Sequence, residues 1–205
     1  MTTSSKYHSF HDLTAGESSG YRIEWISRIS KVLIITPHGG EIEPGTSEIV
    51  RALAGNEFSW YCFEGTRLDG NKHLHITSTR FDEPVSAGML NFAYVVFAVH
   101  GCRSRKKIVF VGGLHNEWVL RFIDAFQQAG FEAERGEYNI SGSSPRNICN
   151  RGNGRKGVQI ELTEGLRKDL FLELDGAGRK QTTPLFDRLI QAGRQTLLEI
   201  NAELF

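Results

Sequence analysis

The sequence is short of cysteine, of long apolar runs and of excess charge of either sign, and each shortage excludes a class of protein. Its 205 residues include three cysteines, none in a CxxC spacing, so we expect reduced thiols and no disulfide framework. No apolar stretch approaches the roughly 18 residues that a membrane span requires. Lysine and arginine number 24, as do aspartate and glutamate, and this balance argues against a general nucleic-acid binder.

The N-terminal stretch lacks a targeting signal. Residues 1–20 are rich in Ser, Thr and Gly, without the apolar segment of a signal peptide. The sequence therefore predicts a loosely ordered lead-in over residues 1–20, a single domain over residues 21–205, and a cytoplasmic protein that cell lysis could release. No heptad or long apolar edge indicates self-association, so we expect a monomer with neither membrane nor nucleic-acid partners.

Apolar runs predict the strands of the fold. The strongest are rich in β-branched residues and cover residues 31–36, 93–99 and 107–111. Weaker candidates cover residues 58–63, 74–77, 131–134, 157–162 and 171–174. Helical spacing of apolar residues predicts helices over residues 47–54, over residues 114–129 and from Thr183 onwards. Strands that alternate with helices indicate an α/β fold with a mainly parallel or mixed central sheet.

Three chemically reactive side chains fall where predicted strands end. His38 and His100 each follow an apolar run and precede glycine, and Glu161 closes the run from residue 157. Ligands of open α/β sheets bind outside the carboxyl ends of the strands, so we expect these side chains to converge on one rim.

The loop after His38 adds two carboxylates, Glu41 and Glu43. Two histidines and one glutamate with an open fourth position form a catalytic zinc set. A further carboxylate could then deprotonate a water whose pKa the zinc lowers. A lone histidine at a strand end is more often a structural residue, but two of them beside an acidic loop favour the metal site. His73 and His75 alternate along residues 73–77, so they share one strand face, and His75 is a candidate substrate contact. An exposed face without a role is the equal alternative.

Residues 141–156 form a basic, glycine-rich loop with no acidic residue. It contains Arg146, Asn150 and Arg151, and Arg167 follows Glu161 closely. Guanidinium groups bind carboxylates through two parallel hydrogen bonds, so a substrate that bears carboxylates is the natural expectation. The alternative is a solvated loop without a binding role.

Other catalytic patterns are weak or missing. The turn at residues 111–114 could accept an anion at a helix N-terminus, yet it matches neither GxxxxGK[ST] nor GxGxxG. No GxSxG motif indicates a serine hydrolase. Cys102 and Cys149 flank the candidate segments, so a nucleophilic thiol has to be considered.

Five segments resemble a known family in order along the chain: TPHGGEIEPGTSEI (36–49), LHITSTRFDEP (74–84), VHGC (99–102), FVGG (110–113) and GVQIELTEGLR (157–167). They are similar to the poly-γ-glutamate hydrolases of phages and bacilli, whose fold resembles that of the zinc carboxypeptidases. The resemblance runs from about residue 21 to the last helix.

The resemblance implies a three-layer α/β/α domain that holds one Zn²⁺ ion. It implies that His38, Glu43 and His100 are the ligands and that Glu161 is the general base. Asn150 and Arg151 are similar to the Asn-Arg pair with which carboxypeptidases hold a substrate carboxylate.

The chain departs from both patterns at one position. Ordinary zinc carboxypeptidases use an HxxE spacing, which would select Glu41, whereas the poly-γ-glutamate hydrolases place the ligand five residues after the histidine. Glycine is commonest in that family where this chain has Glu41. We therefore expect Glu43 to be the ligand and Glu41 to add a carboxylate that could repel an anionic substrate.

The sequence thus predicts a zinc-dependent hydrolase of γ-glutamyl amide bonds, with poly-γ-glutamate as the expected polymer. Arg146, Arg151 and Arg167 would hold the carboxylates of the substrate. Three alternatives stay open: a zinc amidohydrolase for another γ-glutamyl or acyl-amino-acid substrate, a module that binds an acidic polymer without cutting it, and a non-catalytic phage component.

Overall fold

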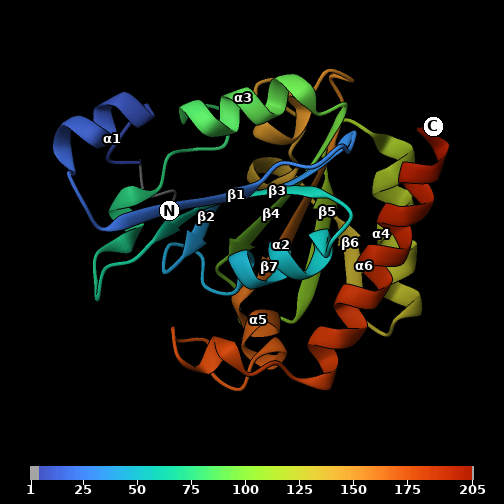
Figure 1. Cartoon of the computed structure of the whole chain (residues 1–205). Coiled ribbons are helices and arrows are strands. Elements are labelled where there is room, and N and C mark those ends of the chain that lie inside the picture. The colour runs from blue at the N-terminus through green and yellow to red at the C-terminus, as the bar shows by residue number, and fades with distance from the viewer. Residues whose placement is uncertain (1–4, 205) are drawn as a thin grey trace.

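A mixed sheet of seven strands lies at the centre of the computed structural model, which describes residues 5–204 (Figure 1). In the order of the sheet, the strands are β1 (Tyr21–Ile26), β3 (Ser59–Gly65), β2 (Val32–Gly40), β4 (Val95–Cys102), β7 (Val158–Thr163), β5 (Ile108–Gly112) and β6 (Glu132–Arg135). β1 runs antiparallel to β3 and β5 antiparallel to β7, while the other neighbouring pairs are parallel.

Helices cover both faces of this sheet and complete the three layers that the sequence predicts. One apolar core lies between the sheet and four helices: α2 (Thr46–Ala54), α4 (Asn116–Gln128), α5 (Glu164–Leu170) and α6 (Pro184–Glu203). A second core lies on the opposite face, under α1 (Phe10–Gly16), α3 (Pro84–Phe92) and the loops beside them. Figure 1 shows α1 and α3 above the sheet and α2, α4, α5 and α6 on the other side.

Local sequence signals fix where the helices begin. The Thr183 hydroxyl accepts a hydrogen bond from the Phe186 N–H, and Pro184 occupies the first turn of α6. Thr163 caps α5 in the same way. Short 3₁₀ turns complete the chain: η1 (Asn71–Leu74), η2 (Tyr138–Ile140), η3 (Ile148–Asn150) and η4 (Gly178–Lys180). None of the helices within residues 5–204 combines the length and the hydropathy needed to cross a bilayer.

The three adjacent parallel strands β2, β4 and β7 place the candidate residues at one edge of the sheet. His100 of β4 lies directly opposite Glu161 of β7 in the strand register. In β2, the pairing with β3 shifts register between Thr36 and Gly39, and such an irregularity re-aims the side chain within it, here His38. The convergence that the sequence predicts at the carboxyl ends of the strands is therefore observed.

Some predicted elements differ from the structure. Residues 74–77 do not form a strand, and Phe171 makes only an isolated bridge with Thr182 instead of starting a strand over residues 171–174. The sequence analysis missed β1, α1, α3 and α5.

The N-terminal segment contributes to the fold from residue 5 onwards. In the expected lead-in over residues 1–20, α1 buries Leu13 completely, and Glu17 pairs with Arg67 and accepts a hydrogen bond from the Tyr7 hydroxyl. Residues 1–4 lie outside the described part of the chain.

Candidate metal centre

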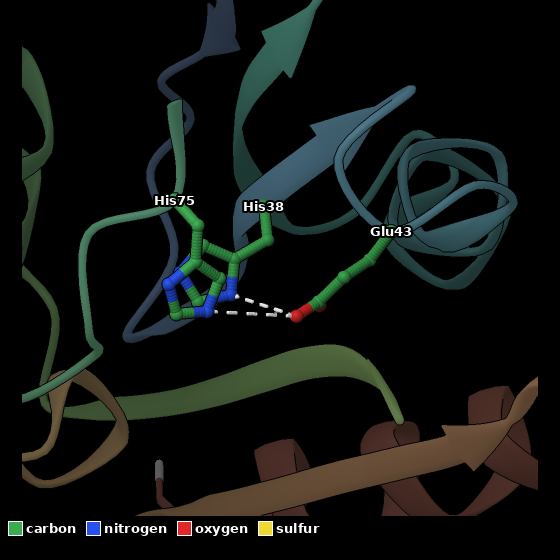
Figure 2. Close-up of side chains that lie close together, drawn as sticks. All are labelled: His38, Glu43 and His75. Carbon is green, nitrogen blue, oxygen red and sulfur yellow. Dashed lines mark ion pairs between the residues drawn. The ribbon is translucent and has the colours of Figure 1, made fainter. Parts of the chain in front are cut away.

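Three of the predicted side chains meet at the carboxyl edge of the sheet. His38 Nδ1 lies 3.2 Å from His100 Nδ1 and 3.1 Å from Glu43 Oε1. His100 Nδ1 lies 3.6 Å from Glu43 Oε2. Both histidines are buried. Figure 2 shows His38 and Glu43 pointing toward each other, together with His75.

Hydrogen bonds on the outer side of both imidazoles decide which nitrogen faces inward. The Nε2 atom of His38 lies 2.7 Å from the backbone carbonyl of Ile76. Because a carbonyl only accepts, this Nε2 carries the proton and Nδ1 presents a lone pair to the site. The Nε2 atom of His100 lies 3.3 Å from the hydroxyl of Ser78. Partners of this kind orient metal-bound histidines in other proteins.

The separations between the two imidazole Nδ1 atoms and the Glu43 carboxylate fit one small cation. Zinc binds nitrogen and oxygen at about 2.0–2.2 Å in a tetrahedron, which places its ligand atoms roughly 3.3–3.6 Å apart. The two Nδ1 atoms lie 3.2 Å apart, and each lies near a different oxygen of Glu43, at 3.1 Å (Oε1) and 3.6 Å (Oε2), so all three distances are close to that range. The residues present therefore fit a zinc ion, with room in a tetrahedron for a fourth ligand.

The backbone holds Glu43 in place. The Gly101 N–H, one residue after His100, donates to Glu43 Oε2 over 2.8 Å, and the Glu43 N–H donates to the His38 carbonyl over 2.9 Å. Burial alone would raise the pKa of Glu43, but the neighbouring His38 and His100 hold it well below its usual range. The carboxylate is therefore ionised, as a metal ligand must be.

His75 is a further candidate ligand beside these three. Its ring stacks on that of His38 with centroids 3.9 Å apart, and its Nε2 lies 3.9 Å from Glu43 Oε1 (Figure 2). His38, Glu43 and His75 together also form a group that could hold a metal. The hydroxyl of Ser5 lies 3.1 Å from Nδ1 of His75. The electrostatic influence of the stacked His38 ring and burial lower the pKa of His75 to about 3, so His75 is neutral at physiological pH.

Glu161 lies beside the cluster as a buried carboxyl group. Burial and the negative charge of Glu43 raise its pKa well above the usual range. The side-chain amide of Gln159 donates to Glu161 Oε1 over 3.1 Å, and the amide of Asn147 donates to Gln159 Oε1 over 2.8 Å. A carboxyl group with a raised pKa and a fixed orientation can exchange protons near neutral pH.

The predicted substrate contacts occupy different environments. Arg146 is exposed, and half-buried Arg151 donates to the carbonyl of Phe81. Buried Asn150 donates to the carbonyls of Gly142 and Ser144 and accepts from the N–H groups of Leu114 and Gly157. Arg167 is also buried, with its guanidinium on backbone carbonyls. Of the three predicted arginine contacts, Arg146 is therefore exposed and Arg151 partly exposed, whereas Arg167 is not accessible.

The additional carboxylate of Glu41 is paired with an arginine. Glu41 Oε1 accepts a hydrogen bond from Nη2 of Arg179 over 2.5 Å, and Nε of the same arginine donates to Glu48 Oε1 over 3.1 Å. Arg179 therefore counters the charge that the sequence analysis expects to repel an anionic substrate.

The alternative chemistries find no support in the geometry. Burial raises the pKa of Cys102 to about 12 and that of the buried Cys149 thiol further, so neither is a ready thiolate nucleophile. At the turn before α4, the N–H groups of Gly113, Leu114 and His115 are bonded to oxygen atoms of the protein, so none of these three is free to bind an anion.

Several residues that shape the site escaped the sequence analysis: Ser5, Ile76, Ser78, Gly101, Asn147, Gln159 and Arg179. One of them carries a readable signal. Gln159 is a polar residue within an apolar strand, two positions before Glu161, and a period of two places both side chains on one face. The others contact the site through backbone atoms or from segments far away in the sequence, so no local pattern indicates them.

A group of His38, Glu43 and His75 that could bind a metal, next to buried His100 and to a carboxyl group with a raised pKa at the edge of an α/β sheet, is typical of metal-dependent hydrolases. The chain belongs to the poly-gamma-glutamate hydrolase family, whose model matches residues 7–192. Among curated proteins, the prophage-derived UPF0714 protein YoqZ of Bacillus subtilis is 37% identical over 180 residues, which cover 86% of this chain. The match covers 65% of YoqZ, slightly less than two thirds of its length.

Solved structures show the same relationship. A bacteriophage poly-gamma-glutamate hydrolase superposes with a TM-score of 0.93 at 30% identity, and the match covers 96% of this chain and 98% of that one. The zinc-free apo form of YndL gives 0.91 at 33% identity over 95% and 98%. A putative carboxypeptidase from Burkholderia mallei, with a TM-score of 0.50 at 16% identity, covers 90% of this chain and 60% of that one and shares the fold alone. The carboxypeptidase-like fold that the sequence predicts is thus confirmed.

Proposed function

We propose that the protein is a zinc-dependent hydrolase that cleaves the γ-glutamyl amide bonds of poly-γ-glutamate. The convergence of His38, Glu43 and His100 supports this function most directly, because their inward atoms lie 3.1–3.6 Å apart, close to tetrahedral spacing, and the Ile76 carbonyl fixes the tautomer of His38. Membership of the family supports the polymer as substrate.

His38 Nδ1, His100 Nδ1 and the Glu43 carboxylate would hold the ion. Zinc, when bound, supplies a Lewis acid that polarises the amide carbonyl and lowers the pKa of water to about 7. Three protein ligands would leave one position open to solvent and substrate, which is the arrangement of catalytic zinc sites.

Glu161 would move the protons of the reaction. In its ionised form, it takes a proton from the water that attacks the γ-amide carbonyl, and it then gives this proton to the leaving amine nitrogen. A raised pKa makes this carboxyl group a stronger base than an exposed glutamate, which favours removal of the proton from water. The hydrogen bond from Gln159 leaves the second carboxylate oxygen available for the water.

Arg146 and Arg151 would bind the α-carboxylates along the polymer. Each glutamate unit carries one carboxylate, so repeated guanidinium contacts fit this substrate. An exposed pair contributes only about 0–1 kcal/mol. His75, neutral and facing Glu43, would donate or accept a hydrogen bond at the scissile unit.

Polymer length measured by gel filtration tests this function. Incubation of poly-γ-glutamate with the protein should shorten the polymer, a chelator should stop the shortening, and added zinc should restore it. Glu161→Gln should lower turnover by about 10²–10⁴-fold at saturating zinc while metal binding persists. Normal turnover of this variant would remove Glu161 from the mechanism, and an intact polymer would reject the substrate.

A pair of histidine variants tests the ligand assignment. Loss of His100 should weaken zinc binding by more than about 100-fold, whereas loss of His75 should weaken it by less than about 10-fold. Competition with a chromophoric chelator measures both affinities. The opposite ranking of His100→Ala and His75→Ala would assign the third position to His75.

A further inference from the structure

Arg167 has a buried guanidinium whose hydrogen bonds all go to backbone carbonyls. It lies on α5 and is 3% exposed. Its Nε donates to Leu162 O over 3.2 Å, Nη1 to Pro44 O over 2.6 Å and Nη2 to Cys102 O over 3.3 Å. Among residues 5–204, no carboxylate forms an ion pair with it. This environment is unusual, because buried charged groups are normally paired with opposite charges.

The three carbonyls belong to the three segments that carry the candidate site. Pro44 directly follows Glu43, and Leu162 directly follows Glu161. Cys102 comes two residues after His100. One planar guanidinium with a fixed fork of donors therefore sets the spacing between two segments that carry metal ligands and the segment that carries the base.

Gly101 makes room for this guanidinium. A Cβ atom at Gly101 would lie 2.6 Å from Cζ of Arg167 and 2.8 Å from its Nε, closer than real Cβ contacts. The N–H of the same glycine donates to Glu43 Oε2. The glycine after His100 thus admits Arg167 on one side and holds Glu43 on the other.

The charge of Arg167 acts on the site without direct pairing. The negative charges of Glu43 and Glu161 oppose the lowering of the Arg167 pKa that burial causes. Arg167 in turn opposes the rise of the Glu161 pKa. A substrate carboxylate has no accessible guanidinium atom here, since the side chain is buried and its three nitrogen atoms donate to carbonyls.

We propose that Arg167 is a positioning residue that fixes Glu43, His100 and Glu161 relative to one another, and not a ligand of the substrate carboxylate. This inference rests on the proposed function for its kinetic consequence. Its structural consequence, a geometry of the metal ligands that depends on Arg167, stands independently of the substrate.

Three variants test the proposal. Arg167→Met removes the charge and the hydrogen-bond donors of the guanidinium but keeps a long side chain. Arg167→Lys keeps the charge. Lys168→Met changes the neighbouring exposed residue and is the matched control. Thermal unfolding identifies any variant that does not fold, and in that case Arg167→Lys carries the test. With poly-γ-glutamate, Arg167→Met should lower kcat by about 100-fold with KM within about 3-fold, because small displacements of catalytic groups have effects of this size. Lys168→Met should match the unmodified protein.

Zinc affinity and the absorption spectrum of the cobalt-loaded protein supply readouts besides turnover. Arg167→Met should weaken zinc binding by about 10–100-fold and alter the cobalt spectrum, with Arg167→Lys intermediate. A raised KM with unchanged kcat would make Arg167 a substrate ligand and overturn the proposal, as would unchanged zinc affinity and spectrum. If the polymer is not cleaved at all, the proposed function fails, but the affinity and the spectrum still decide the role of Arg167.

Discussion

Arg167 and Arg179 are two buried arginines that hold the loop carrying Glu43, and their partners differ. Arg167 donates to three backbone carbonyls, one of them that of Pro44. Arg179 forms ion pairs with the carboxylates of Glu41 and Glu48 and donates to the carbonyl of Leu174. The two guanidinium groups are exposed to similar small extents, 3% and 6%.

Because of this difference, the charge of Arg167 acts on the candidate metal centre, whereas the charge of Arg179 is neutralised by its own partners. Carbonyl oxygens accept one hydrogen bond from each nitrogen of Arg167, but carbonyls carry no net charge, so the positive charge of Arg167 acts on Glu43 and Glu161. The carboxylates of Glu41 and Glu48 neutralise Arg179 where it lies. The same residue type thus serves the candidate metal centre in one position and the stability of a loop in the other.

The largest expected effect comes from a methyl group placed against Arg167, and the same change beside Arg179 is the comparison. Gly101→Ala would put Cβ 2.6 Å from Cζ of Arg167, so we expect kcat to fall by about 100-fold. Gly176→Ala is the matched change beside Arg179. Its Cβ would lie 3.2 Å from Oε1 of Glu41, a flexible side-chain end that can move, so we expect kcat within about 2-fold. Equal losses in the two variants, measured with the polymer, would erase the distinction between the arginines.

A smaller effect, on stability and not on catalysis, is expected from Arg179→Met. The change leaves Glu41 and Glu48 without a counter-charge, and Oε2 of Glu48 is already buried without a partner. Because both carboxylates are partly exposed, we expect the free energy of unfolding to fall by about 1–3 kcal/mol, with kcat within about 3-fold. Urea unfolding measures the first quantity. A loss of kcat as large as that of Arg167→Met would mean that Arg179 also positions the site.

The smallest effect is expected from Glu41→Gln, which removes one charge and keeps a hydrogen-bond acceptor for Arg179. Since Arg179 already counters Glu41, we expect KM for the polyanionic polymer to change by less than about 2-fold and stability by less than about 1 kcal/mol. A KM that falls by 10-fold would show that Glu41 repels the substrate despite its partner.

The sequence was sufficient to predict the central strands and the residues that converge on the metal centre. Strands β2, β4 and β7 are buried on both faces, so their sequences are continuously apolar, and each reactive residue comes where such a run ends. The edge strand β1 was missed because the strand predictions rest mainly on apolar runs, whereas this partly exposed strand alternates polar and apolar residues.

Residues 74–77 show how a correct pattern can predict the wrong element. Leu74 and Ile76 are buried, as the alternation predicts. However, the Ile76 carbonyl accepts its hydrogen bond from His38 and not from a neighbouring strand, so the segment crosses the site as a loop. The orientation of His38 depends on this segment, and no local sequence signal encodes that long-range contact.

The sequence predicts that the arginines of residues 141–156 form a basic loop. It does not predict which arginines face solvent and which are buried. Arg146, Arg151 and Arg167 are the same residue type in the sequence. Only their burial and hydrogen-bond partners show that the guanidinium of Arg146 faces solvent and that of Arg167 joins three segments. Arg179 lies 138 positions away from Glu41, a pairing that only the folded chain creates.

The position of β7 has a consequence for how the chain assembles during synthesis. β7 is the last strand in the sequence, yet it lies between β4 and β5. A ribosome that has released residues up to His100 has supplied both histidines and Glu43, while Glu161, Arg167 and the strand that closes the middle of the sheet are still to come. Because a domain folds as a unit, the sheet closes only after residue 163 has emerged, and the nascent chain until then exposes two unpaired inner strand edges that chaperones would have to protect.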